Sequence, residues 1–362
     1  MKKTLLKHII CPFCKSRFTV NSFDKPKALD SVEEGYLRCS CRSYPIINGV
    51  PRILPDKFLK QILDEHYSWF IQKHKDKLPV LVKSMVHDSF YNKKKKTQKG
   101  FGYEWRKFPE MHDVYKSQFL DWIMPVDKDF FKGKLVLDAG CGTGRHVAFS
   151  TEWGAETIGI DLSEAVDVAF KNTKHHKKTH IIQADIYNLP FKQETFDYIF
   201  SIGVLHHLPR PEQGFDQLVK YLKPKKKVSI WVYGREKNFL LMLANPIRKY
   251  VLSKLPLPFL YSSALIFAGF LYPVCKLIYR PIGKFSPNLL KLLPQGSFFS
   301  YLGSLNFRIV HSIIFDQMLA PVAFYYKRSE VLSWFRNSDV KVLSISWRNR
   351  NSWRVFGEKA AD

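Results

Sequence analysis

The sequence is poor in acidic residues and in cysteine. Its 362 residues include 32 Asp and Glu against 57 Lys and Arg, a formal net charge of +25, and six Cys. A basic surplus favours an anionic partner such as nucleic acid or a membrane surface, and charge alone does not choose between them. Six cysteines in a reducing compartment are better explained by metal binding or packing than by disulfides.

A long apolar segment at the start is also missing. The first residues, MKKTLLKHIICPFC, are basic and contain no apolar run long enough for a secretory signal, so we expect a cytoplasmic protein. With 46% hydrophobic residues and a mean hydropathy of −0.20, the chain is neither disordered nor a bundle of membrane spans. Its length favours two or three domains.

Four of the cysteines form two short pairs within residues 1–56. Cys11 and Cys14 are followed, after a gap, by Cys39 and Cys41. Two such pairs can form tight turns whose thiolates meet at one tetrahedral zinc ion. A segment this small has little core, so a metal would contribute directly to its folding. We therefore predict a zinc-ribbon-like domain over 1–56, and a degenerate ribbon without metal is the alternative.

Residues 57–132 have the character of a helical linker. Apolar residues recur at helical spacing from Asp56 to about Leu78, and a further helix is predicted over 115–123. The run of four lysines at 93–96 is expected in a solvated loop, with a phosphate contact as the alternative.

Residues 133–235 alternate between strand and helix. This rhythm predicts a parallel, doubly wound sheet with right-handed crossovers. The expected strands lie at 134–138, 157–161, 180–185, 196–201 and 227–233. Two more strands, at 340–347 and 353–357, are joined by a short polar turn, so one of them must run antiparallel to the rest. The expected fold is α/β and Rossmann-like, with a seven-stranded, mostly parallel sheet completed by residues 328–362.

Residues 236–327 form an insertion after the fifth core strand. Within it, the apolar run at 255–275 has prolines near both ends, which leaves a continuous helix of only 259–272, too short to span a bilayer. Basic residues flank this run, as expected of a segment that lies on an anionic membrane through 239–284. A buried lid helix over the site is the alternative, and one helix can be both.

The most specific motif is the glycine turn LDAGCGTG at 137–144, which lies between a strand and a helix. Glycines let a ligand approach the main chain, and the helix N-terminus favours a carboxylate there. Acidic residues also end the next two expected strands, at Asp161 and Asp185. This combination is much more specific than glycines alone.

The acidic residues of this constellation indicate a particular cofactor. Asp161 lies where a carboxylate accepts hydrogen bonds from two ribose hydroxyls. Asp185 is placed to accept from an adenine amino group with Ile186 packing on the ring, and Asp138 can face a cationic amine. An amine, a carboxylate, a ribose and an adenine describe S-adenosylmethionine better than NAD.

Residues 133–235 resemble a class I S-adenosylmethionine-dependent methyltransferase, close to the branch of quinone-biosynthesis methyltransferases. The resemblance rests on LDAGCGTG, GIDLS, QADIYNLPF and FDYIFSIGVLHHLPRPE, although LKPKKK stands where the family usually has LKPGG. It implies cofactor contacts at Asp138, Gly140, Gly142, Gly144, Asp161, Leu162, Asp185, Ile186 and Ser201. FGYEW at 101–105 resembles a segment that closes over the cofactor, which implies Tyr103 and Trp105. The Cys pairs with YPIINGVPRIL resemble the short zinc-ribbon activator subunits of RNA and protein methyltransferases.

The family reaction is an in-line displacement at the methyl carbon, in which positioning and desolvation do most of the catalysis. His206 and His207 follow the fourth core strand and are the first candidates for a general base, although a histidine packed under the loop is the alternative. Asp316 and Tyr325 are weaker candidates. Cys141 and Cys275 are expected to be packing residues.

The main evidence on the methyl acceptor is the absence of a motif from the sequence. Methyltransferases acting on nucleobase amines carry an Asn/Asp-Pro-Pro-aromatic motif after the fourth strand, where this chain has Ser201-Ile202-Gly203-Val204. We therefore expect an oxygen or carbon nucleophile on a small or lipid-like molecule. The alternatives are an RNA (tRNA) methyltransferase, which the net charge and the ribbon favour, and a non-catalytic adaptor.

Overall fold

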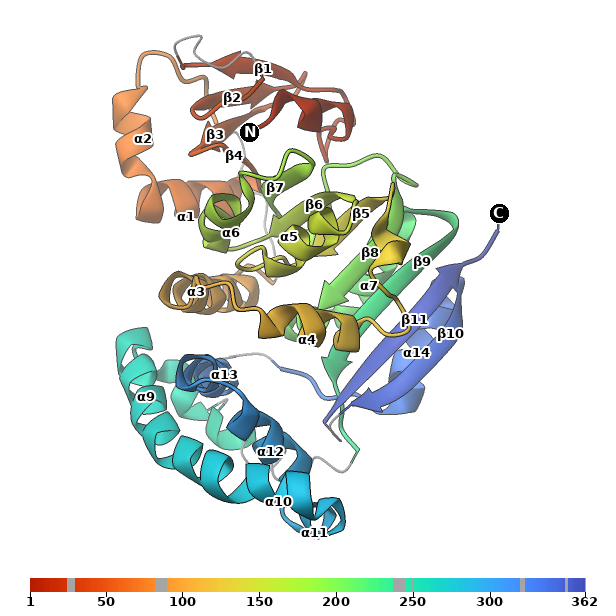
Figure 1. Ribbon diagram of the computed structural model, residues 1–362. Helices are drawn as coiled ribbons and strands as arrows, with labels where there is room; N and C mark the ends of the chain where they lie inside the picture. Colours follow the sequence, from red (N-terminus) through yellow and green to blue (C-terminus); the bar gives the residue numbers. More distant parts are fainter. Residues whose placement is uncertain are drawn as a thin grey trace.

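The computed structural model describes residues 1–24, 30–81, 90–236, 245–248, 250–319, 323–348 and 351–361. It has three parts stacked along one direction: an N-terminal β-rich part, a central sheet covered by helices, and a helical part at the other end (Figure 1). The sheet strands end facing the helical part (Figure 1). This places the carboxyl edge of the sheet, where ligands of open α/β folds bind, next to the insertion.

The central sheet is larger than predicted. Its order is β1-β2-β3-β4-β7-β6-β5-β8-β9-β11-β10, so it has eleven strands where the sequence predicted seven. The core strands are β5 (Leu135–Ala139), β6 (Glu156–Asp161), β7 (Thr179–Ala184), β8 (Phe196–Ile202), β9 (Leu222–Tyr233), β10 (Val340–Arg348) and β11 (Ser352–Lys359). Strands β5 to β9 are mutually parallel, and β11 pairs antiparallel with β9 and with β10. The α/β class and the antiparallel hairpin agree with the prediction, while residues 349 and 350 of its turn lie outside the described residues.

The four additional strands come from the N-terminal part. After the short helix η1 (Lys3–Lys7), they are β1 (Thr19–Ser22), β2 (Gly35–Arg38), β3 (Ser43–Ile47) and β4 (Val50–Ile53). Strands β1 to β4 pair antiparallel, and β4 then pairs parallel with β7, with Arg52 opposite Gln183. The predicted separate domain over 1–56 is therefore continuous with the core sheet. A strand edge exposes unpaired backbone groups, and joining the edge of β7 satisfies them on both sides.

Helices cover both faces of the core strands. Alternate residues of a strand point to opposite faces. Val136 of β5 accordingly packs in the cluster that contains Phe119 and Phe149, and the next residue, Leu137, packs in the cluster that contains Phe215. The covering helices are α4 (Val114–Trp122), α5 (Arg145–Glu152), α6 (Ala165–Thr173), α7 (Pro211–Lys220) and α14 (Arg328–Asn337), with short turns η2 (Asp129–Phe131), η3 (Ile186–Asn188) and η4 (Leu205–His207).

The linker departs from the prediction at two places. The helix expected from 56 to about 78 is two helices, α1 (Asp56–His66) and α2 (Ser68–Lys73), because the chain turns at Tyr67, whose ring is buried. The lysines at 93–96 lie in the helix α3 (Tyr91–Lys107), not in a loop. Lys93 and Lys96 are exposed and Lys95 is half-buried, but Lys94 is buried. Because these residues form a helix, successive side chains point in different directions, and only that of Lys94 is directed to the buried side.

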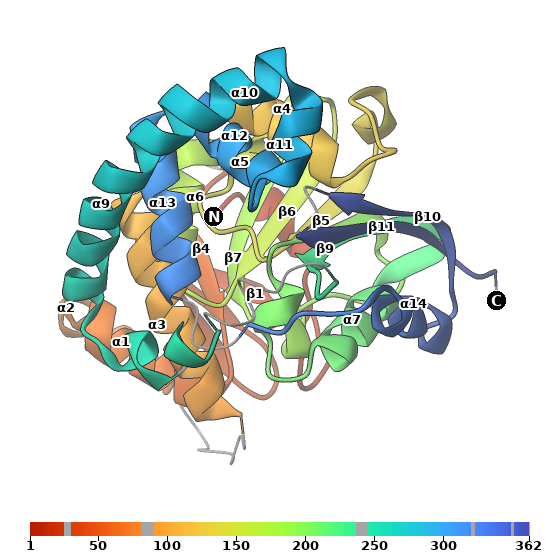
Figure 2. The same ribbon diagram turned by 90° about the horizontal axis from the view of Figure 1, so that it is seen from below.

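The insertion folds as a layer of helices beside the core (Figure 2). Its described elements are η5 (Leu252–Lys254), α9 (Leu257–Val274), η6 (Cys275–Tyr279), α10 (Arg280–Phe285), α11 (Pro287–Leu292), α12 (Gly296–Ser304) and α13 (Phe307–Leu319). The prediction that prolines limit the apolar helix to 259–272 is wrong. The chain accommodates Pro273 inside a helix and follows it with the wider π-helical turn η6, a common adjustment to a missing backbone donor.

The resulting continuous helix, Leu257–Phe285, has 29 residues and is long and apolar enough to cross a membrane by length and composition. One such helix is weak support for a membrane span, because core helices of soluble proteins pass the same test. The packing of this helix against the rest of the chain therefore has to be considered before its relation to a membrane.

Candidate active site

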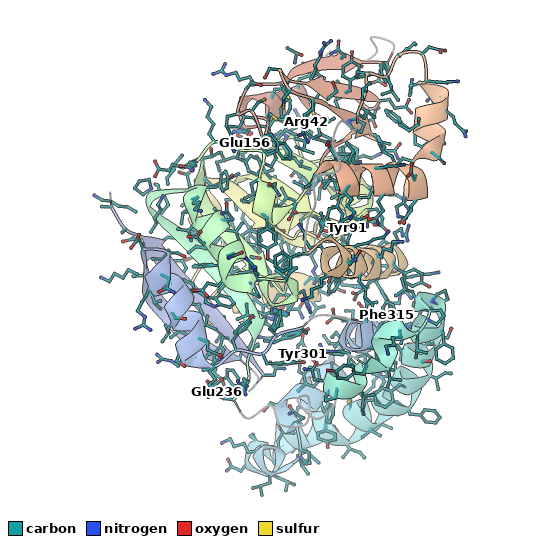
Figure 3. The ribbon with its side chains drawn as sticks, turned by 180° about the vertical axis from the view of Figure 1, so that it is seen from behind. Arg42, Tyr91, Glu156, Glu236, Tyr301 and Phe315 are labelled. Atoms are coloured by element: carbon teal, nitrogen blue, oxygen red, sulfur yellow. The ribbon has the colours of Figure 1, made fainter. Side chains whose placement is uncertain are left out.

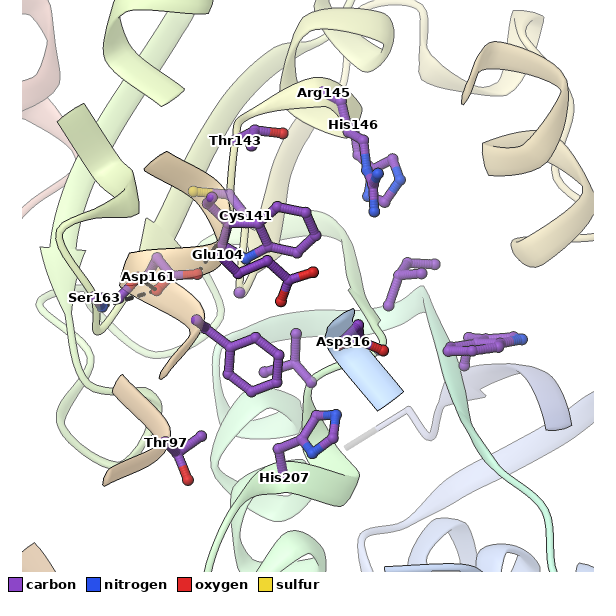
Figure 4. Close-up of a pocket in the computed structure, with 18 of the residues that line it drawn as sticks. Thr97, Glu104, Cys141, Thr143, Arg145, His146, Asp161, Ser163, His207 and Asp316 are labelled. Carbon is purple, nitrogen blue, oxygen red and sulfur yellow. Dashed lines mark hydrogen bonds between the residues drawn. The ribbon is translucent and has the colours of Figure 1, made fainter. Parts of the chain in front are cut away.

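A cavity of about 280 Å³ lies at the carboxyl ends of β5 to β9. Its walls come from the glycine turn after β5, from the loops after β6, β7 and β8, from α3 and from the insertion. Figure 4 shows residues of these elements pointing into one space. Residues far apart in sequence, such as Thr97, Asp161 and Asp316, meet there because the strand ends and the two helical segments face each other.

The glycine turn adopts a backbone that other residues would strain. Gly140, Gly142 and Gly144 have φ of 96°, 49° and 79°. A Cβ on Gly140 would lie 2.2 Å from the Val204 side chain, and one on Gly142 would lie 3.1 Å from Nε1 of Trp105. Gly142 and Trp105 both line the cavity. The turn therefore brings bare main chain against an indole at the cavity wall, which is the arrangement expected for a flat ligand on a backbone surface.

Asp161 is fixed at the end of β6. Its carboxylate accepts hydrogen bonds from the backbone N–H of Gly142 at 3.0 Å, from the N–H of Ser163 at 2.8 Å and from the Ser163 hydroxyl at 2.7 Å. Burial raises the pKa of Asp161, and these donors act in the opposite direction. The side chain lines the cavity with a set orientation, as the ribose-binding role predicted for it requires.

Two buried carboxylates have no hydrogen-bond donor of normal length. They are Asp138, at the end of β5, and Glu104, in α3. Burial raises the pKa of both, and the neighbouring carboxylates Asp161 and Asp316 add to the respective shifts. An unpaired buried acid is costly, and a cationic ligand would compensate for that cost. Glu104 lines the cavity, whereas Asp138 lies behind its wall.

Asp185 does not stand free at its strand end as predicted. Its Oδ2 lies 2.9 Å from Nζ of Lys94, and both side chains are buried. Its Oδ1 accepts a hydrogen bond from the Tyr187 N–H at 3.1 Å. Lys94, which the sequence placed in a solvated loop, therefore neutralises a predicted cofactor carboxylate. Asp185, Ile186 and Lys94 all line the cavity.

The structure separates the two predicted catalytic histidines. His207 lines the cavity, and its ring lies 4.9 Å from that of Phe101. His206 is fully buried outside the lining, both of its ring nitrogens have no partner, and its ring centroid is 3.9 Å from that of Tyr233. Burial lowers the pKa of His206 well below its usual value. His206 is thus a buried residue packed behind the cavity, and His207 is the one of the two that lines it.

The remaining predicted cofactor residues also divide into those that line the cavity and those that lie behind its wall. Leu162 and Trp105 line the cavity. Ser201 does not: its hydroxyl donates to the Ala139 carbonyl at 2.9 Å, which ties β8 to β5 beneath the glycine turn. Tyr103 lies outside the lining, with its ring 6.0 Å from that of Phe315. Gly144 is also behind the wall, where a Cβ would press on Ala169 at 3.0 Å.

Sequence reasoning missed part of the acidic lining. Asp316 of α13, a weak candidate from sequence, accepts a hydrogen bond from the Tyr233 hydroxyl at 3.1 Å, and Gln317 donates to that hydroxyl at 2.9 Å. In Figure 4, Glu104 and Asp316 point into the same space from α3 and α13. Burial raises the pKa of Asp316. Glu104 lies within the FGYEW segment, but only the fold reveals that it is buried.

The four paired cysteines converge in the ribbon. The Sγ of Cys41 is 3.7 Å from that of Cys11 and 3.6 Å from that of Cys39, and the four sulfurs, Cys14 included, lie within 4.8 Å of one another. Tetrahedral Zn–S bonds of ~2.3 Å place ligand sulfurs about 3.8 Å apart. The donor set and its spacing fit a structural zinc site.

Comparisons with known proteins bear on the central third of the chain. Residues 137–230 match the family model described as a methyltransferase domain. Phosphoethanolamine N-methyltransferase 2 of Caenorhabditis elegans is 35% identical over 113 residues, which are 30% of this chain and 25% of that protein. The tRNA (carboxymethyluridine(34)-5-O)-methyltransferase of Arabidopsis thaliana is 33% identical over 125 residues, which are 33% of this chain and 30% of that protein.

Among solved structures, 1,6-didemethyltoxoflavin-N1-methyltransferase of Burkholderia thailandensis, bound to 1,6-didemethyltoxoflavin and S-adenosylhomocysteine, has a TM-score of 0.46. It is 11% identical, with 77% of this chain and 93% of that chain covered. The chain spans only 25% and 30% of the two curated relatives. The family model and the curated relatives support a methyltransferase domain in residues 137–230, and the quinone-biosynthesis branch stays a prediction.

Proposed function

We propose that this protein transfers a methyl group from S-adenosylmethionine to an oxygen or carbon of a small or lipid-like acceptor. The observation that carries the proposal is the cavity itself: the glycine turn and the oriented Asp161, both in residues that match a methyltransferase domain, line it together with the buried, unpaired Glu104 of α3. When bound, S-adenosylmethionine supplies an electrophilic methyl group on a sulfonium cation.

The chain offers a partner for each part of that cofactor. Asp161 is placed to accept from the ribose, and Trp105 covers the glycine turn on which the ligand would lie. Glu104 lines the cavity and lacks a donor, so a cationic amine or sulfonium would satisfy it, and Asp138 would act on that cation from behind the cavity wall. The Lys94–Asp185 pair leaves Ile186 as the apolar contact at the adenine end.

The acceptor would occupy the side of the cavity that the insertion covers. This side is formed largely by apolar and aromatic side chains, among them Phe298, Tyr301, Ile309 and Ile313. Closing a site with such groups excludes water from the nucleophile. Ionisable groups of the lining that can take or hold its proton include His207, Asp316 and Glu104, and Tyr325, the other weaker candidate from the sequence, also lines the cavity.

Calorimetry of S-adenosylmethionine binding tests the cofactor site. Asp161→Asn should weaken binding about tenfold to a hundredfold, because hydrogen bonds to a charged group are worth about 1.5–3 kcal/mol. His206→Gln tests the reassigned histidine and should leave binding and turnover of labelled cofactor in a cell extract within threefold, whereas His207→Gln should lower turnover without lowering affinity. Equal affinity of wild type and Asp161→Asn would refute the site.

A tRNA acceptor is the second candidate. The net charge of +25 and the name of the Arabidopsis relative favour it. Binding that neutralises several phosphates loses affinity steeply with salt. We therefore expect weak, salt-insensitive binding to tRNA if the acceptor is lipid-like. A steep salt dependence, with label from the cofactor entering RNA, would instead support the tRNA activity.

We also propose a structural zinc ion at Cys11, Cys14, Cys39 and Cys41, supported by the sulfur spacing. Metal analysis of the purified protein should find about one zinc per chain. Cys39→Ser should lose most of it, whereas Cys275→Ser, a matched thiol removal far from the ribbon, should keep it. Zinc content that is zero in wild type, or equal in both variants, would contradict the assignment.

A further inference from the structure

We propose that the outer face of the helix Leu257–Phe285, continued by α11, docks flat on an anionic lipid bilayer. This face, called here the docking face, is apolar and exposed. Its large exposed side chains are Phe259, Leu265, Ile266, Phe267, Phe270, Val274, Leu277, Ile278, Phe285, Leu289 and Leu292. Figure 3 shows the side chains of this helix projecting away from the body of the protein. Contiguous apolar surface of this extent marks an interaction site.

The opposite side of the helix is buried against other helices of the protein. Leu260, Ala264, Ala268 and Cys275 recur four or seven residues apart, are buried, and belong to the same cluster as residues of α12 and α13. The contact continues in hydrogen bonds, since the Tyr272 hydroxyl donates to the Leu305 carbonyl at 3.1 Å. Crossing a bilayer would strip this whole stripe from α13. The helix therefore lies along a membrane, with its length parallel to the surface.

The positive charge of the insertion indicates that the surface it binds is anionic. Residues 237–315 contain nine Lys and Arg and no Asp or Glu. Four of these cations, Lys254, Lys276, Lys284 and Lys291, are exposed on or beside the docking face. An apolar face bordered by lysines without acids matches the interface of an anionic membrane, where tails accept the apolar side chains and headgroups attract the lysines. A second protein of ordinary composition would not need this complete absence of acids.

The geometry also connects the docking face with the cavity. Phe298 and Tyr301 of α12 line the cavity, and α12 packs against η6 and α10, which carry part of the docking face. A bilayer on the docking face would thus be separated from the cavity by one layer of helices. The docking itself does not depend on the proposed methyl transfer.

Vesicle sedimentation of the full chain tests the proposal. Vesicles of phosphatidylcholine with phosphatidylglycerol should bind the wild type at least tenfold more tightly than vesicles of phosphatidylcholine alone. The variant Ile266→Glu/Phe270→Glu/Leu277→Glu changes side chains that are 63%, 75% and 72% exposed, and it should lose at least tenfold in binding. Replacing Lys276, Lys284 and Lys291 by Ala should cost about fivefold for each lysine at low salt.

The matched control is Trp69→Glu/Val80→Glu/Leu343→Glu, which adds the same charge at exposed apolar positions outside the insertion and should bind like wild type. S-adenosylmethionine affinity of both triple variants, measured by calorimetry, shows that they are folded and is independent of docking. No binding by wild type, or equal loss in the control, overturns the proposal. So does a wild-type dimer that the first variant converts to a monomer while vesicle binding is unchanged, because the face would then bind a second copy.

Discussion

The two segments that flank the core sheet, the N-terminal ribbon and the helical insertion, differ in the polar contacts at their junctions. The ribbon shares an apolar cluster with the core and adds a buried polar contact: Arg52 is fully buried, donates to Gln183 at 3.0 Å and to the Ile47 carbonyl at 3.1 Å, and pairs with Asp167. The insertion joins mainly through apolar packing of α9, α12 and α13 with the side of the core that holds Phe119 and Phe200. Specific polar contacts fix a register, whereas apolar packing tolerates adjustment. The first suits an extension of a sheet, and the second suits the wall of a binding cavity.

The two junctions also differ in the charge state that they favour. At the ribbon, Glu156 lies 2.9 Å from Nε2 of His8 and 3.2 Å from Nε2 of His180, and the His180 contact holds its pKa well below the usual range. At the insertion, burial raises the pKa of Glu104 and of Asp316. The ribbon junction is strongest with its carboxylate ionised, whereas the insertion junction carries acids whose burial disfavours ionisation.

The largest expected effect is at the ribbon junction. Arg52→Met should lower the free energy of unfolding by about 2 kcal/mol, because it removes the donor of the buried Gln183 side-chain oxygen and of the Ile47 carbonyl, whereas the partly exposed Asp167 can be solvated. Urea denaturation measures the change. Arg38→Met, which replaces an exposed arginine of strand β2 in the same ribbon, is the control and should change stability by less than about 0.5 kcal/mol. A loss below 1 kcal/mol for Arg52→Met would mean that the ribbon is not held by this contact.

The next largest effect is on the pH dependence of stability, which Glu156 and Glu104 should change in opposite directions. Glu156 has a lowered pKa when folded, so its stabilisation is present above the ordinary value of 4.5 and is lost as the pH falls below it. Glu104 has a raised pKa, so the folded state loses stability as the pH rises above 4.5 towards the folded pKa. One proton changes stability by at most about 1.4 kcal/mol per pH unit.

Variants separate these two contributions. Relative to wild type, Glu156→Gln should be destabilised at pH 7 and should approach wild type as the pH is lowered. Glu104→Gln should gain on wild type as the pH is raised from 4.5 to 7. Thermal unfolding across this pH range without cofactor provides the measurement. If both variants shift in the same direction, the contrast between the junctions is wrong.

The smallest effect is expected at the exposed edge of the insertion. Arg308 contacts Glu110 at 3.0 Å and the Tyr261 hydroxyl at 3.1 Å, and its side chain is partly exposed. Arg308→Met should cost less than about 1 kcal/mol of stability, because exposed ion pairs contribute little. The same urea experiment applies. A loss comparable to that of Arg52→Met would remove the distinction between a polar and an apolar junction.

Much of the central fold follows from local sequence. Apolar runs such as Leu135–Ala139, glycines at fixed spacing and acidic residues at strand ends depend on neighbours along the chain, so the positions of the core strands along the chain and the glycine turn were predictable. The burial of Lys94 was not, because it depends on α3 facing Asp185, a residue 91 positions away. His206 and His207 are adjacent in sequence, and only the packing of Tyr233 decides which one lines the cavity.

The sequence by itself determined the α/β core, the glycine turn with Asp161 and the pairing of four cysteines, because each rests on residue type and short-range spacing. The tertiary structure alone decided that the ribbon continues the sheet at β4–β7, that Glu104 and Asp316 meet, and that Pro273 does not end its helix. It also decided which side of that apolar helix stays uncovered. Those outcomes depend on the surfaces that distant segments bury against one another. The shortage of acidic residues supports a docking face only because the fold exposes an apolar helix within the acid-free segment 237–315.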